Sequence, residues 1–308
     1  LSSLPESIGN LSKLTKLSVN NNNLSSLPES IGNLVELTEL SICCNNLTSL
    51  PSCIGNFTAL ERLSVRKNDI ALLPETIGDL VSLEYLDVSK NRLTSLPSSI
   101  GSLSNLVELD GSSNNLTSLP SSICDLLNLS CLVVCKNCLT SLPSSIGNLT
   151  RLDMLDVSNN RLTSLPSSIG SLVRLEFLLI FSNELVSLPE TIGNLLKLYA
   201  LKVSDNKLIT LPSSISNITN LMQLFLDKNY LMEIPRSVFE LRAYLSIEGN
   251  PLGMINFDYL QYRSRFQKLK IDSYFADMID PIYHSNIDFV TNDYVCLLYT
   301  SPSPRDQR

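Results

Sequence analysis

A strict period of 23 residues governs most of this chain of 308 residues. Counted from Leu14, position 15 of each unit is proline, and no insertion interrupts the series. A chain of near-identical short units stacks them in one direction, so the repeat overrides the two domains that length alone would predict. The prolines are Pro5, Pro28, Pro51, Pro74, Pro97, Pro120, Pro143, Pro166, Pro189, Pro212 and Pro235.

Position 9 of each unit is asparagine, where the chain is expected to leave a strand. A buried amide at this point can pair with backbone donors and acceptors of the loop, and repetition would make a ladder along the stack. A shortened copy closes at Asn250. The predicted ladder consists of Asn22, Asn45, Asn68, Asn91, Asn114, Asn137, Asn160, Asn183, Asn206 and Asn229.

Positions 4 and 6, such as Leu17 and Val19, alternate with polar residues. This alternation predicts one strand per unit with one buried face, and the units must stack at about 4.8 Å into a parallel sheet. Proline fits the opposite side, where no sheet ladder needs its N–H. Glycine follows isoleucine in eight units, which predicts a turn with unusual φ, and Cys124 and Ser216 replace it in two others.

The full pattern, LxxLxLxxNxLxxLPxxIGxLxx, resembles that of leucine-rich repeat proteins from Leu1 to about Leu252. The LPxxIG half and the unit length are similar to the cytoplasmic class, which includes plant intracellular Ras-group-related proteins and animal Ras-binding scaffolds. The resemblance implies an α/β solenoid shaped like a horseshoe, with about 11 repeats and a parallel sheet on its concave face. It also implies a protein partner in intracellular signalling, of which a small GTPase is one example.

The compartment is left open by the sequence. The resemblance favours the cytoplasm, whereas eight N-x-S/T sequons allow an extracellular, glycosylated protein. We interpret the sequons as by-products of the repeat consensus, because most occupy two Asn-bearing repeat positions. They are Asn10, Asn23, Asn46, Asn56, Asn115, Asn128, Asn148 and Asn217.

Composition argues against several classes of function. The net charge of −7 disfavours binding to nucleic acid, and no run of 18 apolar residues could span a membrane. The eight cysteines show no disulfide framework and are expected to be reduced. Zinc at Cys131, Cys135 and Cys138 is the alternative, but these residues lack a fourth ligand.

No catalytic constellation is found in the repeats. The only histidine is His284, beyond the repeats, and no glycine-rich phosphate loop occurs. Asp87, Asp110 and Asp156 share position 5, where a solubilising role is favoured over a catalytic carboxylate pair. We therefore expect no cofactor and no enzymatic activity.

The outward positions 3, 5 and 7 carry the strongest functional signal. They are polar in the first half of the chain and largely apolar from Cys131 onward, most clearly in the stretch LEFLLIFSN, 175–183. An apolar patch on a rigid sheet is typical of a protein-binding surface, although drift or cover by another segment is an alternative. The predicted partner-binding residues are Val133, Met154, Asp156, Phe177, Leu179, Phe181, Lys202 and Phe225.

Three segments follow from these patterns. Residues 1–252 form the solenoid, which we expect to be truncated at its N-terminus because it begins within a repeat. Residues 253–295 are a predicted capping segment containing a helix over Asn256–Ile271, with a basic membrane-binding or calmodulin-binding helix as the alternative. Residues 296–308 resemble the translated mosaic-end adapter of transposase-based sequencing libraries.

The sequence thus predicts a non-catalytic scaffold that binds a protein on the concave face of its sheet. Two alternatives remain open. The chain is a recognition segment of a larger enzyme, such as a Roco-type GTPase or a receptor kinase, or it is the ectodomain of an extracellular receptor.

Overall fold

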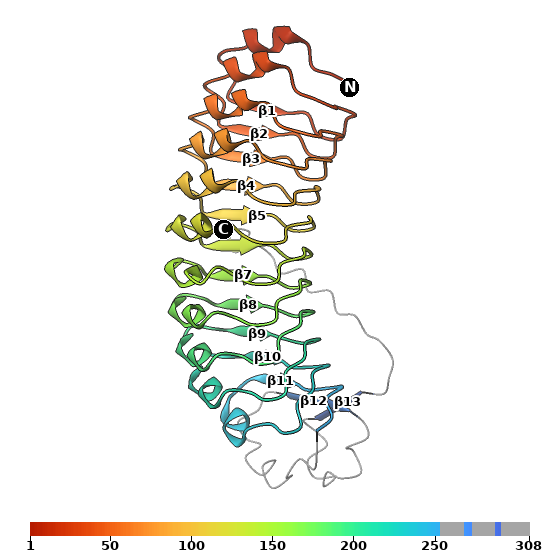
Figure 1. The fold of residues 1–308 in the computed structure, drawn as a ribbon, viewed down its shortest axis with the longest axis vertical. Helices are drawn as coiled ribbons and strands as arrows, with labels where there is room; N and C mark the ends of the chain where they lie inside the picture. The colour runs from red at the N-terminus through yellow and green to blue at the C-terminus, as the bar shows by residue number, and fades with distance from the viewer. Residues whose placement is uncertain (253–267, 273–286, 291–308) are drawn as a thin grey trace.

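The computed structural model describes residues 1–252, 268–272 and 287–290. The repeats coil into a long, gently curved stack in which strands form one side and short 3-10 helices the other (Figure 1). All strands lie in one parallel sheet in chain order, β1 to β13. The repeats thus build the predicted solenoid, with eleven strands in its first 252 residues.

Each coil contributes one short strand to the sheet. The strands are β1 Lys16–Ser18, β2 Glu39–Ser41, β3 Arg62–Ser64, β4 Tyr85–Asp87, β5 Glu108–Asp110, β6 Cys131–Val133, β7 Met154–Asp156, β8 Phe177–Leu179, β9 Ala200–Lys202, β10 Gln223–Phe225, β11 Tyr244–Ser246, β12 Lys268–Asp272 and β13 Ile287–Val290.

The opposite side of each coil is a 3-10 helix that begins directly after the repeat proline, except in η7. The helices are η1 Glu6–Asn10, η2 Glu29–Asn33, η3 Ser52–Asn56, η4 Glu75–Asp79, η5 Ser98–Ser102, η6 Ser121–Asp125, η7 Ile146–Asn148, η8 Ser167–Ser171, η9 Glu190–Asn194, η10 Ser213–Asn217 and η11 Arg236–Glu240.

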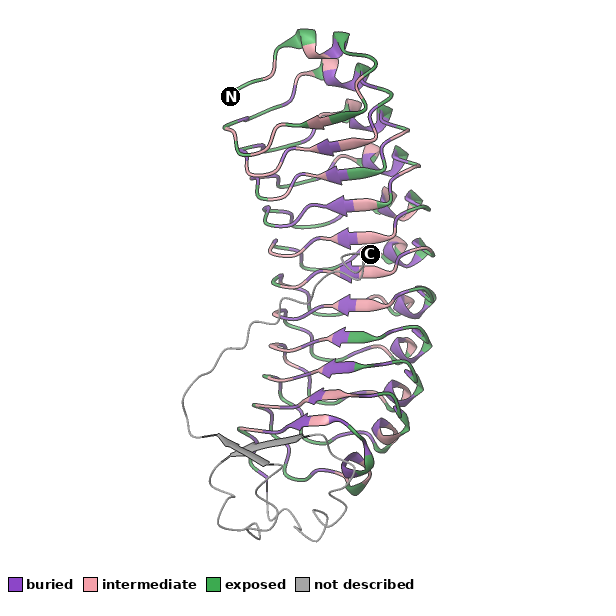
Figure 2. Cartoon of the chain, turned by 180° about the vertical axis from the view of Figure 1, so that it is seen from behind, coloured by how far each residue is buried: buried purple, intermediate pink, exposed green. Residues whose placement is uncertain are grey.

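Equivalent residues of neighbouring coils pair directly across the sheet, as Leu63 does with Leu86. Positions 4 and 6 point inward, so that Leu63 and Val65 are fully buried. Figure 2 shows the buried residues along the inner side of the described coils that follow the first one, whereas among residues 1–23 only Gly9 is buried. The core is therefore one continuous column of Leu, Ile and Val, and each coil buries its apolar face mainly against its two neighbours.

The asparagines of position 9 form a hydrogen-bonded ladder. Asn137 is typical: its Nδ2 donates to the carbonyls of Val134 in its own coil (3.1 Å) and Gly111 in the preceding coil (3.0 Å). Its Oδ1 accepts the N–H of Leu116, also in the preceding coil, at 2.9 Å. Asn250 repeats this geometry as a further rung.

The residue before each ladder asparagine has a left-handed backbone. At position 8, φ lies between 51° and 57°, and four of the ten residues there are lysines. Such a conformation is costly for non-glycine residues and persists only where the surroundings determine it. Here the N–H of Lys90 donates to the carbonyl of Ser112 in the next coil at 2.8 Å, which holds the turn.

The repeat glycines are required by close contact and not by φ, so the predicted reason was wrong. Gly249 is the only described glycine with positive φ, and it lies outside the isoleucine–glycine series. A Cβ at Gly101 would lie 2.5 Å from the carbonyl oxygen of Ser122 in the next helix. Glycine at this position therefore lets adjacent 3-10 helices approach backbone to backbone.

Helix η7 is shorter than the others, and it lies beside Cys124, which replaces the repeat glycine. The residue of the next coil that faces it is Ser145, the equivalent of Ser122. There η7 begins only at Ile146, whereas the other helices begin two positions earlier in the repeat. The shortened helix thus lies directly beside the added Cys124 side chain. Ser216 makes the same replacement beside η11, which keeps five residues.

The predicted helix over Asn256–Ile271 is wrong in its described part. Residues 268–272 form β12, which pairs with β11 on one side and β13 on the other. A strand is favoured here because the free edge of β11 offers backbone donors and acceptors that a helix could not use. The remainder of the predicted helix, residues 256–267, lies outside the described residues, as do the adapter-like residues 296–308.

The glycine series provides a test with an internal control. Gly101→Ala should lower the free energy of unfolding by about 1–3 kcal/mol, since its methyl group would overlap the Ser122 carbonyl. Gly111→Ala should be neutral or slightly stabilising, because its Cβ would meet the nearest atoms at 3.6 and 3.7 Å. Urea unfolding of both variants measures the difference, and equal effects would contradict the close-contact explanation.

Candidate functional site

The eight predicted partner-binding residues lie on five consecutive strands or directly after one of them. Val133 belongs to β6, Met154 and Asp156 to β7, and Phe177 and Leu179 to β8. Phe181 follows β8, Lys202 ends β9 and Phe225 ends β10. The register pairs Met154 with Phe177, and Leu179 with Lys202, which in turn pairs with Phe225.

These side chains are less exposed than the sequence suggested. Phe177 is 37% exposed, whereas Leu179, Phe181, Met154 and the other apolar members are half-buried. Neighbouring side chains on the flat sheet shield one another, so the cost of leaving them in water is smaller than for isolated groups. Ala200, which lies beside Phe177 on β9, is almost fully buried and leaves space next to the ring.

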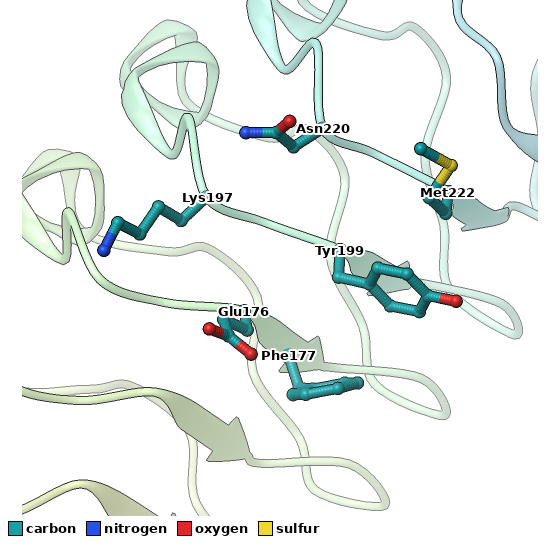
Figure 3. A pocket seen from close by; sticks show the side chains of 6 residues that line it. All are labelled: Glu176, Phe177, Lys197, Tyr199, Asn220 and Met222. Carbon is teal, nitrogen blue, oxygen red and sulfur yellow. The ribbon is translucent and has the colours of Figure 1, made fainter.

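A shallow hollow of about 390 Å³ adjoins Phe177 at the edge where strands β8 to β10 begin (Figure 3). The rings of Phe177 and Tyr199 form its floor, with centroids 5.9 Å apart. Tyr199 is 43% exposed. The remaining lining residues are Glu176, Lys197, Asn220 and Met222.

The sequence analysis missed Tyr199 and Met222. Both occupy position 2 of the repeat, one residue before the first outward position, position 3. The signal was present, since position 2 is polar in seven of the first eight complete units, with Val107 as the exception, and then becomes Tyr199 and Met222 in two consecutive units. The site therefore extends from the sheet face to its edge.

A second aromatic pair lies at the C-terminal end of the same surface. The rings of Phe225 and Tyr244 have centroids 5.3 Å apart, and Nζ of Lys202 lies 5.3 Å from the Phe225 ring centroid. Burial lowers the pKa of Lys202, and the charge of Asp156 opposes this effect. Lys202 thus separates Phe225 from the hollow instead of leaving one continuous apolar wall.

Half-buried carboxylates adjoin the apolar residues on their N-terminal side. Burial raises the pKa of Asp110 and Asp156 above their usual values, although hydrogen bonds from Ser112 and Ser158 oppose the shift. Burial also raises the pKa of the Cys131 thiol to about 12, with further contributions from Glu108, Asp110, Asp156 and Asp153. The strands around β6 therefore lie in a negative potential.

Charged groups also mark the N-terminal part of the face. The Arg62 guanidinium carbon lies 4.2 Å from the centroid of the Tyr85 ring. Burial raises the pKa of Tyr85 to about 12, and nearby Asp87 adds to the shift. This basic and aromatic pair on β3 and β4 forms a separate feature, remote from Phe177.

The described residues offer groups for non-covalent recognition. The seven described cysteines are free thiols. Nowhere in residues 1–252 or the two short strands beyond do three His, Cys, Asp or Glu side chains gather as metal ligands. No described helix is long and apolar enough to cross a membrane.

The raised pKa of Asp110 predicts a stability that depends on pH. A carboxyl whose pKa is higher in the folded state stabilises the fold at acid pH, and this contribution is lost as pH rises through the folded value. Asp110→Asn should therefore raise the thermal midpoint at pH 7, since its Oδ1 can still accept the Ser112 N–H. The gain should shrink as pH falls through the raised folded pKa, because the buried carboxyl then takes up a proton and is no longer charged, and little gain should remain near pH 4, close to the ordinary pKa of the unfolded chain. Exposed Asp79→Asn is the control, and an equal gain at both pH values would contradict the burial effect.

Comparison with family models shows what kind of repeat this is. A model described as a leucine-rich repeat region matches residues 1–71 and 68–139, and a second one, described as a leucine-rich repeat, matches residues 151–172. Together these matches cover more than half of the chain. No curated protein sequence matches at a significant level.

Solved structures of the same architecture come from bacteria and plants. The leucine-rich repeat protein LIC12759 of Leptospira interrogans is 29% identical, with a TM-score of 0.60, over 88% of this chain and 81% of that one. The ectodomain of the Arabidopsis thaliana receptor kinase GASSHO1/SCHENGEN3 is 34% identical, with a TM-score of 0.76, over 88% of this chain. This chain spans only 34% of that ectodomain and 42% of the plant protein PEPR1.

The family matches, the ladder asparagines and the stacked parallel strands agree with one another. The chain belongs to the leucine-rich repeat proteins.

Proposed function

We propose that the solenoid is a non-catalytic scaffold that binds a partner protein through the concave face of strands β6 to β10. The observation that carries the proposal is the group of apolar side chains around Phe177, whose ring is itself exposed. Rigid sheets with exposed aromatic residues beside charged groups are typical of protein-binding hot spots. The partner-binding residues are Val133, Met154, Asp156, Phe177, Leu179, Phe181, Lys202 and Phe225, to which we add Tyr199 and Met222.

We place this scaffold in intracellular signalling, with small GTPases among the candidate partners. The support for this is the 23-residue LPxxIG unit, which is similar to that of cytoplasmic Ras-group-related repeats. The free thiols of the described cysteines are compatible with a reducing compartment.

The main proposal can be tested by partner capture with matched variants. Phe177→Ser with Phe181→Ser should abolish capture of specific proteins, identified by mass spectrometry, because it removes two aromatic anchors. The control, Leu127→Ser with Val173→Ser, changes side chains that are 58% and 55% exposed away from the sheet, and it should capture the same proteins as the wild type.

Circular dichroism and thermal melting should show both variants folded, since the substituted side chains lie outside the core. Unfolding of the Phe variant would mean that these rings are structural. Unchanged capture by a folded Phe variant would move the interface elsewhere, with the surface around Arg62, Arg66 and Tyr85 as the next candidate.

A second candidate function is peptide recognition outside the cell, as one segment of a longer receptor or receptor kinase. Several similar structures are plant receptors, including the receptor kinase GASSHO1/SCHENGEN3 with CASPARIAN STRIP INTEGRITY FACTOR 2 and the peptide hormone receptor RGFR1 with RGF2. Seven of the eight sequon asparagines are exposed, and none lies at an outward sheet position. Glycans there would leave the concave face open.

Enzymatic removal of N-linked glycans distinguishes the two candidates. The native protein should keep its mass after treatment with a peptide N-glycosidase if it is cytoplasmic, because sequons are glycosylated only in the secretory pathway. A loss of mass would reject the cytoplasmic assignment and favour the receptor segment. An unrelated glycoprotein treated in parallel controls for enzyme activity.

A further inference from the structure

We propose that the occupant of the hollow is an extended segment of a partner protein that carries a large apolar side chain and, about four or five residues away, a lysine or arginine. This inference rests on the proposed function, because it concerns the same concave face. It adds the chemistry and the spacing of the segment that would bind there.

The apolar anchor is defined by the hollow. Phe177 and Tyr199 present exposed ring surface, and Met222 lines the hollow beside them (Figure 3). A volume of about 390 Å³ accommodates one phenylalanine, leucine or methionine side chain with the adjoining backbone. Burial of such a side chain against two rings would remove all three from water at once.

The basic residue is defined by the charge of the neighbouring strands. In the units of β4 to β8, no lysine or arginine occupies the outward positions 3, 5 and 7 or the edge position 2, and Lys90 and Lys136 occupy position 8. The same four positions carry seven carboxylates. These form the acidic zone, which consists of Glu84, Asp87, Glu108, Asp110, Asp153, Asp156 and Glu176.

Some carboxylates of the acidic zone are already engaged. Asp153 forms an ion pair with Arg174 at 3.3 Å, and Asp87 accepts hydrogen bonds from Ser64 and Ser89 through both oxygens. By contrast, no described lysine or arginine forms an ion pair with Glu108, Asp110 or Asp156. Ser112 and Ser158 donate to Oδ1 of Asp110 and Asp156, and the Cys135 thiol also donates to Asp156, so each carboxylate keeps acceptor capacity for a partner's cation.

The direction of the bound segment follows from Lys202. Its ammonium group lies over Phe225 on the C-terminal side of the hollow, so a second cation there would be repelled. On the N-terminal side the acidic zone begins at Glu176, which also lines the hollow. The basic residue of the partner should therefore lie toward β5 and β7.

The spacing comes from the register of the sheet. The hollow is centred near β9 at position 2, whereas Asp156 is on β7 and Asp110 on β5 at position 5. At about 4.8 Å between strands and 3.3 Å per residue along them, the separation is roughly 14 Å to Asp156 and roughly 22 Å to Asp110. An extended chain covers these distances in about four or five residues, with the side chains supplying the remainder.

Panning a random 12-residue phage-displayed library on the immobilised full chain tests the proposal. Enriched peptides should share an apolar residue and a Lys or Arg at the stated spacing. For a synthetic peptide of that sequence, Phe177→Ser with Tyr199→Ser and, separately, Asp110→Asn with Asp156→Asn should each weaken binding at least about tenfold. Replacing the peptide's basic residue with alanine should weaken binding to the wild type but cause little further loss on the Asp110→Asn, Asp156→Asn variant.

The outcomes separate this inference from the proposed function. Peptides that depend on Phe177 and Tyr199 but carry no basic residue, or carry it at random spacing, would overturn the inference and leave the concave face as the binding surface. If no enriched peptide is sensitive to the Phe177→Ser, Tyr199→Ser variant, both the inference and the proposed surface are wrong. Thermal melting of each variant establishes that lost binding is not lost folding.

Discussion

The structure depends on hydrogen bonds that each coil can complete only with its neighbours. A three-residue strand has no partner within its own coil, and the buried amide of Asn137 is satisfied in part by the carbonyl of Gly111 and the N–H of Leu116 in the preceding coil. Buried polar groups without partners would cost about 1–3 kcal/mol each. One coil alone is therefore unstable, and each coil is stabilised by the folded coils on either side of it.

The same constraint explains why the sequence was so informative about the fold. Because each coil packs against neighbours of the same shape, the same residue types are needed at the same repeat positions. The 23-residue period, the inward alternation of Leu17 and Val19 and the ladder asparagines could therefore all be recognised from the sequence alone. The positions of the outward-facing side chains followed from the same alternation of inward and outward residues along each strand. Leu179, Lys202 and Phe225 lie side by side in the sheet because they occupy the same position in three consecutive units.

Features that depend on contacts between units in three dimensions could not be predicted in this way. The glycine series suggested special torsion angles, but the controlling fact is the distance from Gly101 to a carbonyl in the next coil. The helical pattern before Ile271 was outweighed by the open edge of β11. The hollow was missed because three of its six lining residues, Glu176, Tyr199 and Met222, occupy position 2 at the sheet margin, where the Tyr199 ring lies beside that of Phe177.

The glycines on the helical side have a consequence for the sheet on the other side. Strand spacing is fixed by backbone hydrogen bonds, whereas spacing on the outer side is set by how closely one 3-10 helix can approach the next. The difference between these two spacings determines how strongly the solenoid curves. Cys124 lies in η6, on the helical side, where most other coils have glycine, and a side chain added there is expected to change the angle between neighbouring coils and so the way their strands present side chains. Evolution can reshape the recognition surface of such a protein through residues that no ligand ever contacts.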